Sequence, residues 1–359
     1  MPSRSEGSVM DNNNHSIVGP GDLILITGSN GFIGSRVVHA LLRSGYRNLR
    51  CFVRPSSDLR KLQAVLDTFP EAQVEVVAGN LLSRQDCVKA AEGVAVIIHL
   101  AASSDKSFPG SFMNCVVTTR NLLDGARESG TLRRFMNVGS FAVYSNWNMS
   151  RGSLLDESCE LETHLVERAE AYAFAKLKQD ELVMEYSQKY GIPYVIVRPG
   201  AVFGPGTRHI TGRVGIDTFG VFFHIGGSNQ IPFTYVDNCA EAMVLAATKP
   251  GVEGEVFNIV DDDLPSSRKF LRNYKKYGKR FRSLYFPYWL FYLLSWVWES
   301  YAEWSQGQLP PAFNRRRCAT YYKGNIYSNQ KLKDRLGWQP SVPFSEASRR
   351  YFEFVRGMS

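Results

Sequence analysis

Short apolar runs alternate with amphipathic segments along the first 200 residues of the chain. The runs suit buried strands and occupy residues 23–27, 49–53, 74–78, 94–100, 135–138 and 194–197. Between them lie segments with apolar positions at helical spacing, at residues 35–42, 83–91, 112–126 and 171–190. Alternation of this kind predicts an α/β fold with a doubly wound parallel sheet.

The first predicted strand leads directly into a glycine-rich turn and then a helix. The turn reads Thr27-Gly28-Ser29-Asn30-Gly31-Phe32-Ile33-Gly34. Glycines let the backbone pass close to a pyrophosphate, and the N–H groups and dipole of the helix start favour an anion. Three glycines near a helix start also occur in ordinary tight turns. The order of strand, turn, helix and strand favours a dinucleotide site.

The regular alternation ends near Pro199. Beyond it, turns at residues 204–206, 226–227 and 250–251 interrupt shorter elements, which predicts a smaller, irregular lobe. We expect residues 22–200 to bind the nucleotide. We expect residues 201–359 to form mainly a substrate-binding lobe, with some segments returning to the main sheet. Residues 1–21 are polar and lack the apolar core of a signal peptide, so we expect a disordered extension.

Composition narrows the class of protein. The six cysteines are scattered without a C-x-x-C pair or a grouping with histidine, which favours reduced thiols, a cytoplasmic location and no metal site. The net charge of +8 comes without a nucleic-acid-binding motif, so we expect no nucleic-acid partner. Basic residues concentrate just before an aromatic stretch at residues 284–304, at Arg268, Lys269, Arg272, Lys275, Lys276, Lys279, Arg280 and Arg282.

Three side chains are candidates for proton chemistry. Tyr172 and Lys176 are four residues apart in a predicted helix and should share one face. A neighbouring ammonium would lower the pKa of the phenol, which could then exchange a proton with a substrate oxygen. Ser140 follows a predicted strand, where its hydroxyl could orient that oxygen. The chain has no G-x-S-x-G elbow, which disfavours acyl transfer.

These features together resemble the extended short-chain dehydrogenase/reductases, within the epimerase/dehydratase superfamily. The residues that carry the resemblance are the glycine turn, Ser140, Tyr172-x-x-x-Lys176, His99-Leu100-Ala101-Ala102 and Arg198-Pro199-Gly200-Ala201-Val202-Phe203-Gly204-Pro205. The G-x-x-G-x-x-G spacing is the one that this family uses. The resemblance covers roughly residues 22–354 and implies a Rossmann domain with a small substrate lobe. It also implies a homodimer.

The resemblance implies a role for each matching residue. Ser140, Tyr172 and Lys176 take the places of the catalytic serine, tyrosine and lysine. Asn80 stands where the family usually has aspartate. The implied cofactor-binding residues are Gly28, Asn30, Gly31, Phe32, Ile33, Gly34, Arg54, Ser57, Asn80, Leu81, Leu100, Ala101, Ala102, Tyr172, Lys176 and Pro199.

Charge at the end of the second predicted strand bears on the choice of cofactor. An acidic residue there would bind the 2′-hydroxyl of NAD and repel a 2′-phosphate. The sequence instead has Val53-Arg54-Pro55-Ser56-Ser57 and no carboxylate before Asp58. Arg54 and Ser57 therefore favour NADP(H), although NAD(H) is possible and Arg54 could simply lie on the surface.

Two substrate classes compete. Nucleotide-sugar enzymes of the family usually carry an arginine just before the strand ending in Y-V-x-D and an asparagine soon after the R-P step. Neither is present in residues 231–238 or at Gly200-Ala201. Tyr235-Val236-Asp237-Asn238 resembles the 3β-hydroxysteroid dehydrogenase-like branch instead. We therefore expect hydride transfer on an apolar, sterol- or β-keto-acid-like alcohol or ketone, with a nucleotide-sugar epimerase, dehydratase or reductase as the alternative.

The aromatic stretch at residues 284–304 has two interpretations. Its apolar core of about thirteen residues is shorter than the roughly 20 needed to span a bilayer. Such a stripe often packs in a protein core. The alternative is peripheral contact with an anionic membrane, since eight basic residues precede it.

Overall fold

The main sheet is parallel and joins segments from most of the chain. The computed structural model describes residues 16–102, 105–207, 210–218, 220–306, 308 and 313–358. Within them, seven strands form one sheet in the order β12-β7-β5-β4-β1-β2-β3. Its strands are β1 (Ile24–Thr27), β2 (Asn48–Val53), β3 (Gln73–Ala78), β4 (Val96–His99), β5 (Arg134–Val138), β7 (Tyr194–Pro199) and β12 (Val256–Ile259). The predicted doubly wound α/β fold is confirmed.

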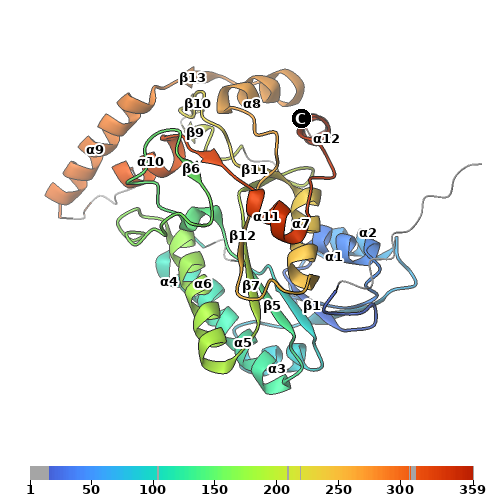
Figure 1. Ribbon diagram of the computed structural model, residues 1–359. Helices are drawn as coiled ribbons and strands as arrows, with labels where there is room; N and C mark the ends of the chain where they lie inside the picture. The colour runs from blue at the N-terminus through green and yellow to red at the C-terminus, as the bar shows by residue number, and fades with distance from the viewer. Residues whose placement is uncertain are drawn as a thin grey trace, which may run out of the picture.

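Helices cover both faces of this sheet (Figure 1). One layer contains α1 (Gly34–Arg43), α2 (Arg60–Leu66), α7 (Val236–Thr248) and α11 (Gln330–Leu336). The other contains α3 (Arg84–Ala91), α5 (Thr118–Ser129) and α6 (Ala171–Tyr190). In this second layer α4 (Phe108–Phe112) continues through a π-helical turn, η2 (Met113–Val117), into α5. Three of the four predicted helical segments correspond to α1, α3 and α6, and the fourth, residues 112–126, runs from the end of α4 through η2 into α5.

β1 shows why an uninterrupted apolar run forms a central strand. Successive side chains point to opposite faces. Ile24 and Ile26 pack with α1 and α7, whereas Leu25 packs with α3 and α5, and all three are fully buried. Because both faces are covered, no polar position interrupts the run.

The predicted N-terminal extension falls largely outside the described residues. Residues 16–21, which it included, lie against the main domain. The Ile17 N–H donates to the Thr248 carbonyl at 2.8 Å, and Val18 is buried in the core beside α1. The folded unit therefore begins before residue 22, because Ile17 and Val18 pack against the core of the main domain.

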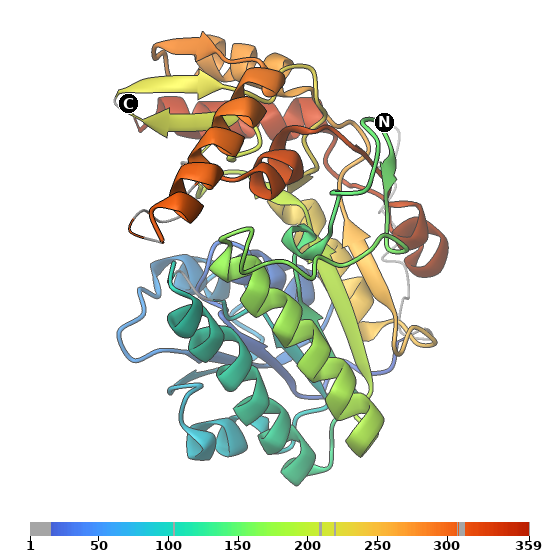
Figure 2. The ribbon, with the colours of Figure 1, turned by 90° about the vertical axis from the view of Figure 1, so that its left-hand side faces the viewer.

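The smaller lobe stands above the main sheet (Figure 2). A sheet of β9 (Gly215–Thr218), β10 (Val221–His224) and β13 (Ser283–Tyr285) packs with α8 (Ser267–Asn273), its π-helical continuation η4 (Tyr274–Gly278) and α12 (Phe344–Arg356). Aromatic side chains, including Phe203, Phe233, Phe270 and Tyr351, fill its core. Two-stranded ladders complete it: β8 (Ala201–Phe203) with β11 (Phe233–Tyr235), and β6 (Leu154–Leu155) with β14 (Ile326–Tyr327).

The aromatic stretch forms α9 (Tyr288–Trp304), which extends along the outside of the lobe (Figures 1 and 2). Its inner face lies on α10 (Arg315–Tyr322), where Ser295 and Ala302 are buried. Its outer face leaves Trp289 66% and Trp304 77% exposed. Packing within the described chain therefore covers only the inner face of α9 and leaves its outer face exposed. In the described chain, no helix combines the length and apolar character that crossing a membrane requires.

Candidate active site

The glycine turn after β1 folds so tightly that Gly28 and Gly34 have no room for a side chain. Gly28 has φ +69°, and a Cβ there would lie 3.1 Å from the Ala101 nitrogen. A Cβ on Gly34 would lie 2.0 Å from the Gly28 carbonyl oxygen. No side chain caps the first turn of α1, and no acidic residue lies in it. The turn therefore offers an anion a close, uncontested approach to backbone N–H groups.

Two adjoining cavities lie at the carboxyl ends of β1, β4, β5 and β7. The first, of about 270 Å³, contains Ser140, Tyr172, Lys176 and Pro199. The second, of about 350 Å³, contains Asn30, Arg54, Ser57, Asn80 and Leu81. They share four lining residues: Gly28, Gly31, Leu100 and Ala102.

Every residue named from the sequence for catalysis or cofactor binding lines one of these cavities. Phe32, Ile33 and Gly34 line the first, and Ala101 lines the second. Asn114 and Thr118, from η2 and the start of α5, also line the second cavity and were not predicted. Their helical segment carries no motif, so only the fold brings them to the site.

The residues present fit a dinucleotide. The glycine turn would hold the pyrophosphate, and the second cavity would hold the adenosine half. Among the described residues that line the second cavity, none carries a carboxylate. Asp58 is engaged by Arg60, with a 2.6 Å contact between the guanidinium and the carboxylate. Among the described residues, no cluster of His, Cys, Asp or Glu is arranged to hold a metal ion.

Ser140, Tyr172 and Lys176 come together in the first cavity. Ser140 follows β5 and begins the short 3₁₀ helix η3 (Phe141–Val143), where its Oγ accepts from the Ala142 N–H at 3.2 Å. Tyr172 and Lys176 lie one turn apart in α6. Lys176 is 1% exposed, and its ammonium donates to the Val138 carbonyl at 2.7 Å and to Gln179 Oε1 at 2.8 Å.

The pKa of Tyr172 departs from the sequence argument. Burial raises it to about 12, while the hydrogen bond with Ser140 acts in the opposite direction. Although 41% of the residue is exposed to the cavity, the loss of water around its hydroxyl dominates. Burial also lowers the pKa of Lys176. The expected lowering of the phenol pKa is therefore wrong for this geometry, in which Val138 and Gln179 hold the ammonium.

A buried chain of hydrogen bonds connects Lys176 to the cofactor loop. Gln179 Nε2 donates to Thr119 Oγ1 at 2.7 Å, and this hydroxyl donates to the Cys115 carbonyl at 2.6 Å. Thr119 Oγ1 must therefore accept from His99 Nε2, which lies 2.9 Å away. Because burial lowers the pKa of His99 to about 3, the ring is neutral and its Nδ1 is an acceptor.

The remaining links of the chain follow from this tautomer. The Thr27 hydroxyl donates to His99 Nδ1 at 2.7 Å and accepts from the Ala101 N–H at 3.3 Å. The ammonium and the loop that lines both cavities are thus fixed relative to each other. His99 and Thr27 were identified only as parts of motifs, and Gln179 and Thr119 were missed, because their residue types signal nothing until four elements converge.

A second buried network joins α6 to β5, the strand that Ser140 follows, and to β7. Asp180 of α6 accepts from Asn137 Nδ2 at 2.7 Å and from Arg198 Nε at 3.1 Å. The Arg198 guanidinium also lies 5.0 Å from the centre of the Tyr144 ring. Since Asn137 and Arg198 belong to β5 and β7, this ion pair fixes α6 against the strands that present the site.

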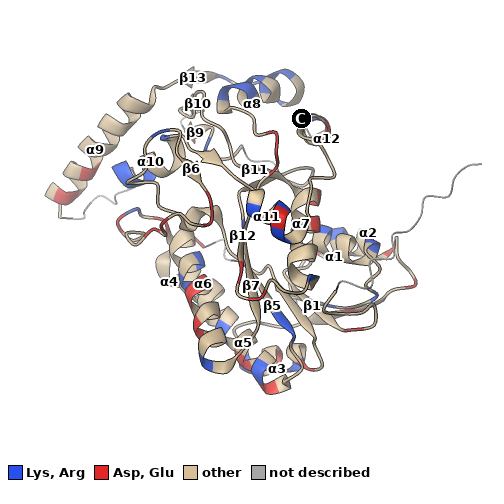
Figure 3. Ribbon diagram, viewed as in Figure 1, with Lys and Arg blue, Asp and Glu red and all other residues tan. Residues whose placement is uncertain are grey.

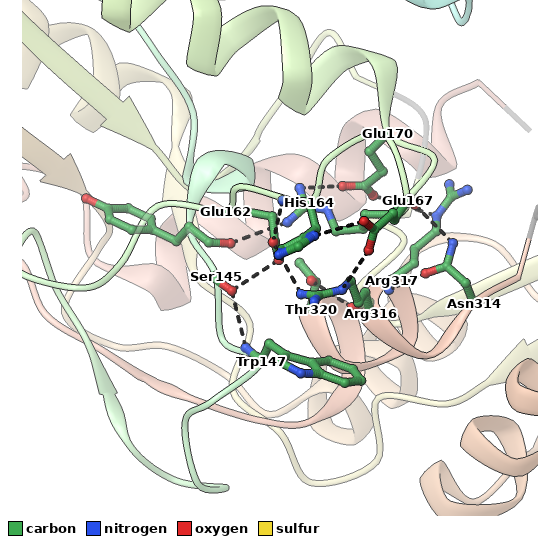
Figure 4. Close-up of polar contacts among 12 residues, drawn as sticks. Ser145, Trp147, Glu162, His164, Glu167, Glu170, Asn314, Arg316, Arg317 and Thr320 are labelled. Carbon is green, nitrogen blue, oxygen red and sulfur yellow. Dashed lines mark hydrogen bonds and ion pairs between the residues drawn. The ribbon is translucent and has the colours of Figure 1, made fainter.

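Polar contacts near the start of α6 tie the lobe to the catalytic segment (Figure 4). Arg168 is fully buried and donates to the carbonyls of Ala142 and Tyr144, which follow Ser140. Its own carbonyl accepts from Asn314 Nδ2 at 3.1 Å. Arg317 lies 3.6 Å from Glu170, two residues before Tyr172. The beginning of α10 is therefore held against residues 168–170, which directly precede α6 and Tyr172.

A third cavity, of about 470 Å³, lies between α9 and α10. Its described lining is largely aromatic and apolar, with Arg317 as the one cationic side chain among those residues. The lining consists of Thr211, Gly212, Ile216, Phe291, Ser295, Phe313, Asn314, Arg317, Cys318, Tyr321 and Tyr322. The Arg317 contact with Glu170 places this cavity next to the segment that carries Tyr172.

Comparisons with known proteins agree with this architecture. The family model described as "NAD dependent epimerase/dehydratase family" matches residues 24–260. The mouse sterol-4-alpha-carboxylate 3-dehydrogenase, decarboxylating, is 24% identical over 90% of this chain and 88% of its own length. An uncharacterized UDP-glucose epimerase of Bacillus subtilis is 28% identical over 66% of this chain and 76% of its own length.

Solved structures share the fold. UDP-glucuronic acid 4-epimerase from Bacillus cereus, in complex with NAD, superposes with a TM-score of 0.69 at 21% identity, covering 94% of this chain and 99% of that chain. The segment matched by the family model begins with β1 and ends just after β12, so it contains every strand of the main sheet. The chain is thus an enzyme of the NAD dependent epimerase/dehydratase family, among the extended short-chain dehydrogenase/reductases.

Proposed function

We propose that this enzyme is an NADP(H)-dependent oxidoreductase that acts on a secondary alcohol or ketone of an apolar, sterol- or β-keto-acid-like substrate. The observation that carries the proposal is the aromatic cavity between α9 and α10, beside the segment that bears Tyr172. A wall of this kind suits a fused-ring or alkyl body. The proposed substrate class is also supported by the sterol dehydrogenase, which aligns over 90% of the chain, whereas the UDP-glucose epimerase aligns over 66%.

The proposed chemistry assigns one task to each of three residues that line the first cavity: Ser140, Tyr172 and Lys176. Bound nicotinamide dinucleotide supplies or accepts the hydride. In the reduction, the Tyr172 phenol donates its proton to the carbonyl oxygen, which becomes the alcohol oxygen. The Ser140 hydroxyl donates a hydrogen bond to that oxygen and orients it. Lys176, held by Val138 and Gln179, places a positive charge beside the cofactor-binding wall.

Nucleotide-sugar chemistry is the second candidate, because a UDP-glucose epimerase is among the relatives. A panel assay separates the two. NADPH oxidation should be observed with steroid ketones or β-keto acids and should be absent with keto sugars. Epimerisation of UDP-sugars without added cofactor is the discriminating control. Turnover of UDP-sugars alone would replace the proposal with the second candidate.

The preference for NADP(H) rests on Arg54. This exposed side chain lines the second cavity together with Ser57, and no described lining residue there is acidic. Arg54→Asp should raise the KM for NADPH by about 10–100-fold, as expected for the loss of a charge-assisted contact. The KM for NADH should change by less than about threefold. Steady-state kinetics with both cofactors measure the two values.

Lys89→Asp is the matched control for Arg54→Asp. Lys89 is an exposed cation of α3 that lines neither cavity, so reversing its charge should leave both KM values unchanged. Equal effects of Arg54→Asp on NADPH and NADH would contradict the assignment. The predicted homodimer and cytoplasmic location stay predictions.

A further inference from the structure

The outer face of α9 carries large apolar side chains that are between 45% and 77% exposed in the described chain. Trp296 is 47% exposed, and the exposed set continues onto β13 through Leu284 and Tyr285. The complete set is Leu284, Tyr285, Trp289, Leu293, Leu294, Trp296, Val297, Tyr301 and Trp304. We call these nine residues the α9 face. A contiguous apolar surface of this kind marks an interaction site.

The inner face of α9 is the one that packs against its own lobe. Ser295 and Ala302 are small residues that let the helix approach α10. Glu299 pairs with Arg315 at 2.7 Å. Phe291 contacts Phe313 and Tyr322. The α9 face therefore points away from the lobe that holds the helix, and nothing among the described residues covers it.

A basic surface adjoins the α9 face across β13 (Figure 3). We define it as the eight cations at residues 268–282, of which all but Lys275 are exposed. Among the described residues, none of the eight enters an ion pair with a carboxylate. The Arg268 guanidinium lies 5.5 Å from the centre of the Tyr285 ring, so the two surfaces meet.

We propose that the α9 face and this basic surface dock together on an anionic lipid bilayer. Tryptophan and tyrosine favour the headgroup region, where one end of the ring is wet and the other apolar. A 17-residue helix is about 25 Å long and would lie in the plane of the interface. The neighbouring cations would bind anionic headgroups.

A second copy of the chain fits the same surface less well. In a two-fold pair the same patch of each copy enters the interface, so the partner brings the same eight cations and not their opposite charge. Adding like charge at one interface opposes association. An anionic bilayer offers negative headgroups to the eight cations and an apolar layer to the α9 face. The inference does not depend on the proposed substrate, since vesicle binding is measured without turnover.

The first test is sedimentation of the full chain with vesicles of phosphatidylcholine containing about 30% phosphatidylserine. We expect binding at about 0.05 M salt and at least a tenfold weaker association at about 0.5 M salt or with pure phosphatidylcholine. Tryptophan fluorescence should shift to shorter wavelength on binding. Absence of binding to anionic vesicles at low salt would overturn the proposal.

Variants divide the surface into its two parts. Lys269→Glu with Lys276→Glu, and separately Trp289→Ser with Trp296→Ser, should each weaken binding by at least about tenfold. The matched controls are Lys89→Glu with Lys189→Glu and Val166→Ser with Met358→Ser, which are exposed residues outside the surface. The controls should bind like the unaltered chain.

Two further results would count against membrane docking. Equal loss in variants and controls would show that the surface has no special role. If the chain does not bind vesicles but forms a dimer, and the tryptophan variant loses that dimer, the α9 face would be the contact with a second copy of the chain. Because all substituted side chains are exposed, thermal unfolding should stay unchanged and separate these outcomes from misfolding.

Discussion

Replacing Tyr172 with phenylalanine should lower kcat by about 10²–10⁴-fold while leaving cofactor affinity nearly unchanged. The substitution removes only the hydroxyl that faces Ser140, and the ring continues to line the first cavity. The proton donor is lost, whereas the glycine turn and the second cavity are untouched. Steady-state turnover and NADPH binding by fluorescence measure the two effects separately.

The matched control for this variant is Tyr190→Phe. Tyr190 ends the same helix, is exposed and lies outside both cavities, so kcat should stay within about twofold. Full turnover by the Tyr172→Phe enzyme would overturn the catalytic assignment and favour a non-catalytic role for the chain.

The raised pKa of Tyr172 gives the two reaction directions different pH profiles. With a pKa of about 12 the phenol is protonated at neutral pH and ready to donate, so kcat/KM for the reduction should be flat. The oxidation needs the phenolate, whose fraction grows about tenfold per pH unit between about pH 7 and about pH 9. A plateau of the oxidation profile within this range would show that Lys176 lowers the pKa once substrate and cofactor are bound.

Periodicity predicted most of the main sheet because each strand between two helical layers carries its own signal. β1 and β4 are apolar except for their last residues, Thr27 and His99, and the apolar positions of the helices between strands repeat at 3.6 residues. β12 escaped prediction because Asn258 interrupts a run of only four residues. That asparagine is buried by its tertiary context, where Tyr144 donates to its Oδ1 at 2.9 Å.

Residues that act through distant partners could not be predicted. The motif residues share a cavity because strand order brings loop ends together. The pKa of Tyr172 instead depends on which groups hold Lys176, and Gln179 and Val138 were not identifiable as those groups from spacing. The position of α9 was also undetermined, since its sequence is apolar on most sides. Only the packing on α10 shows which side chains stay uncovered.

Asp180→Ala should lower the free energy of unfolding by about 3–5 kcal/mol, since it leaves a buried guanidinium without its carboxylate. Asp180 is fully buried and Arg198 is 3% exposed. Asn137 would lose the acceptor for its amide as well. Urea unfolding at neutral pH, followed by circular dichroism, gives the change in free energy.

Glu181→Ala is the control in the same helix. Glu181 pairs with Lys178 on the exposed side of α6 at 2.6 Å, and such surface pairs contribute about 0–1 kcal/mol. Asp180→Leu combined with Arg198→Met removes both charges and should recover much of the stability that Asp180→Ala loses. If Asp180→Ala and Glu181→Ala destabilise equally, the buried pair does not fix α6 against the strands. If the double variant recovers stability but not turnover, the pair positions Ser140 in addition to stabilising the fold.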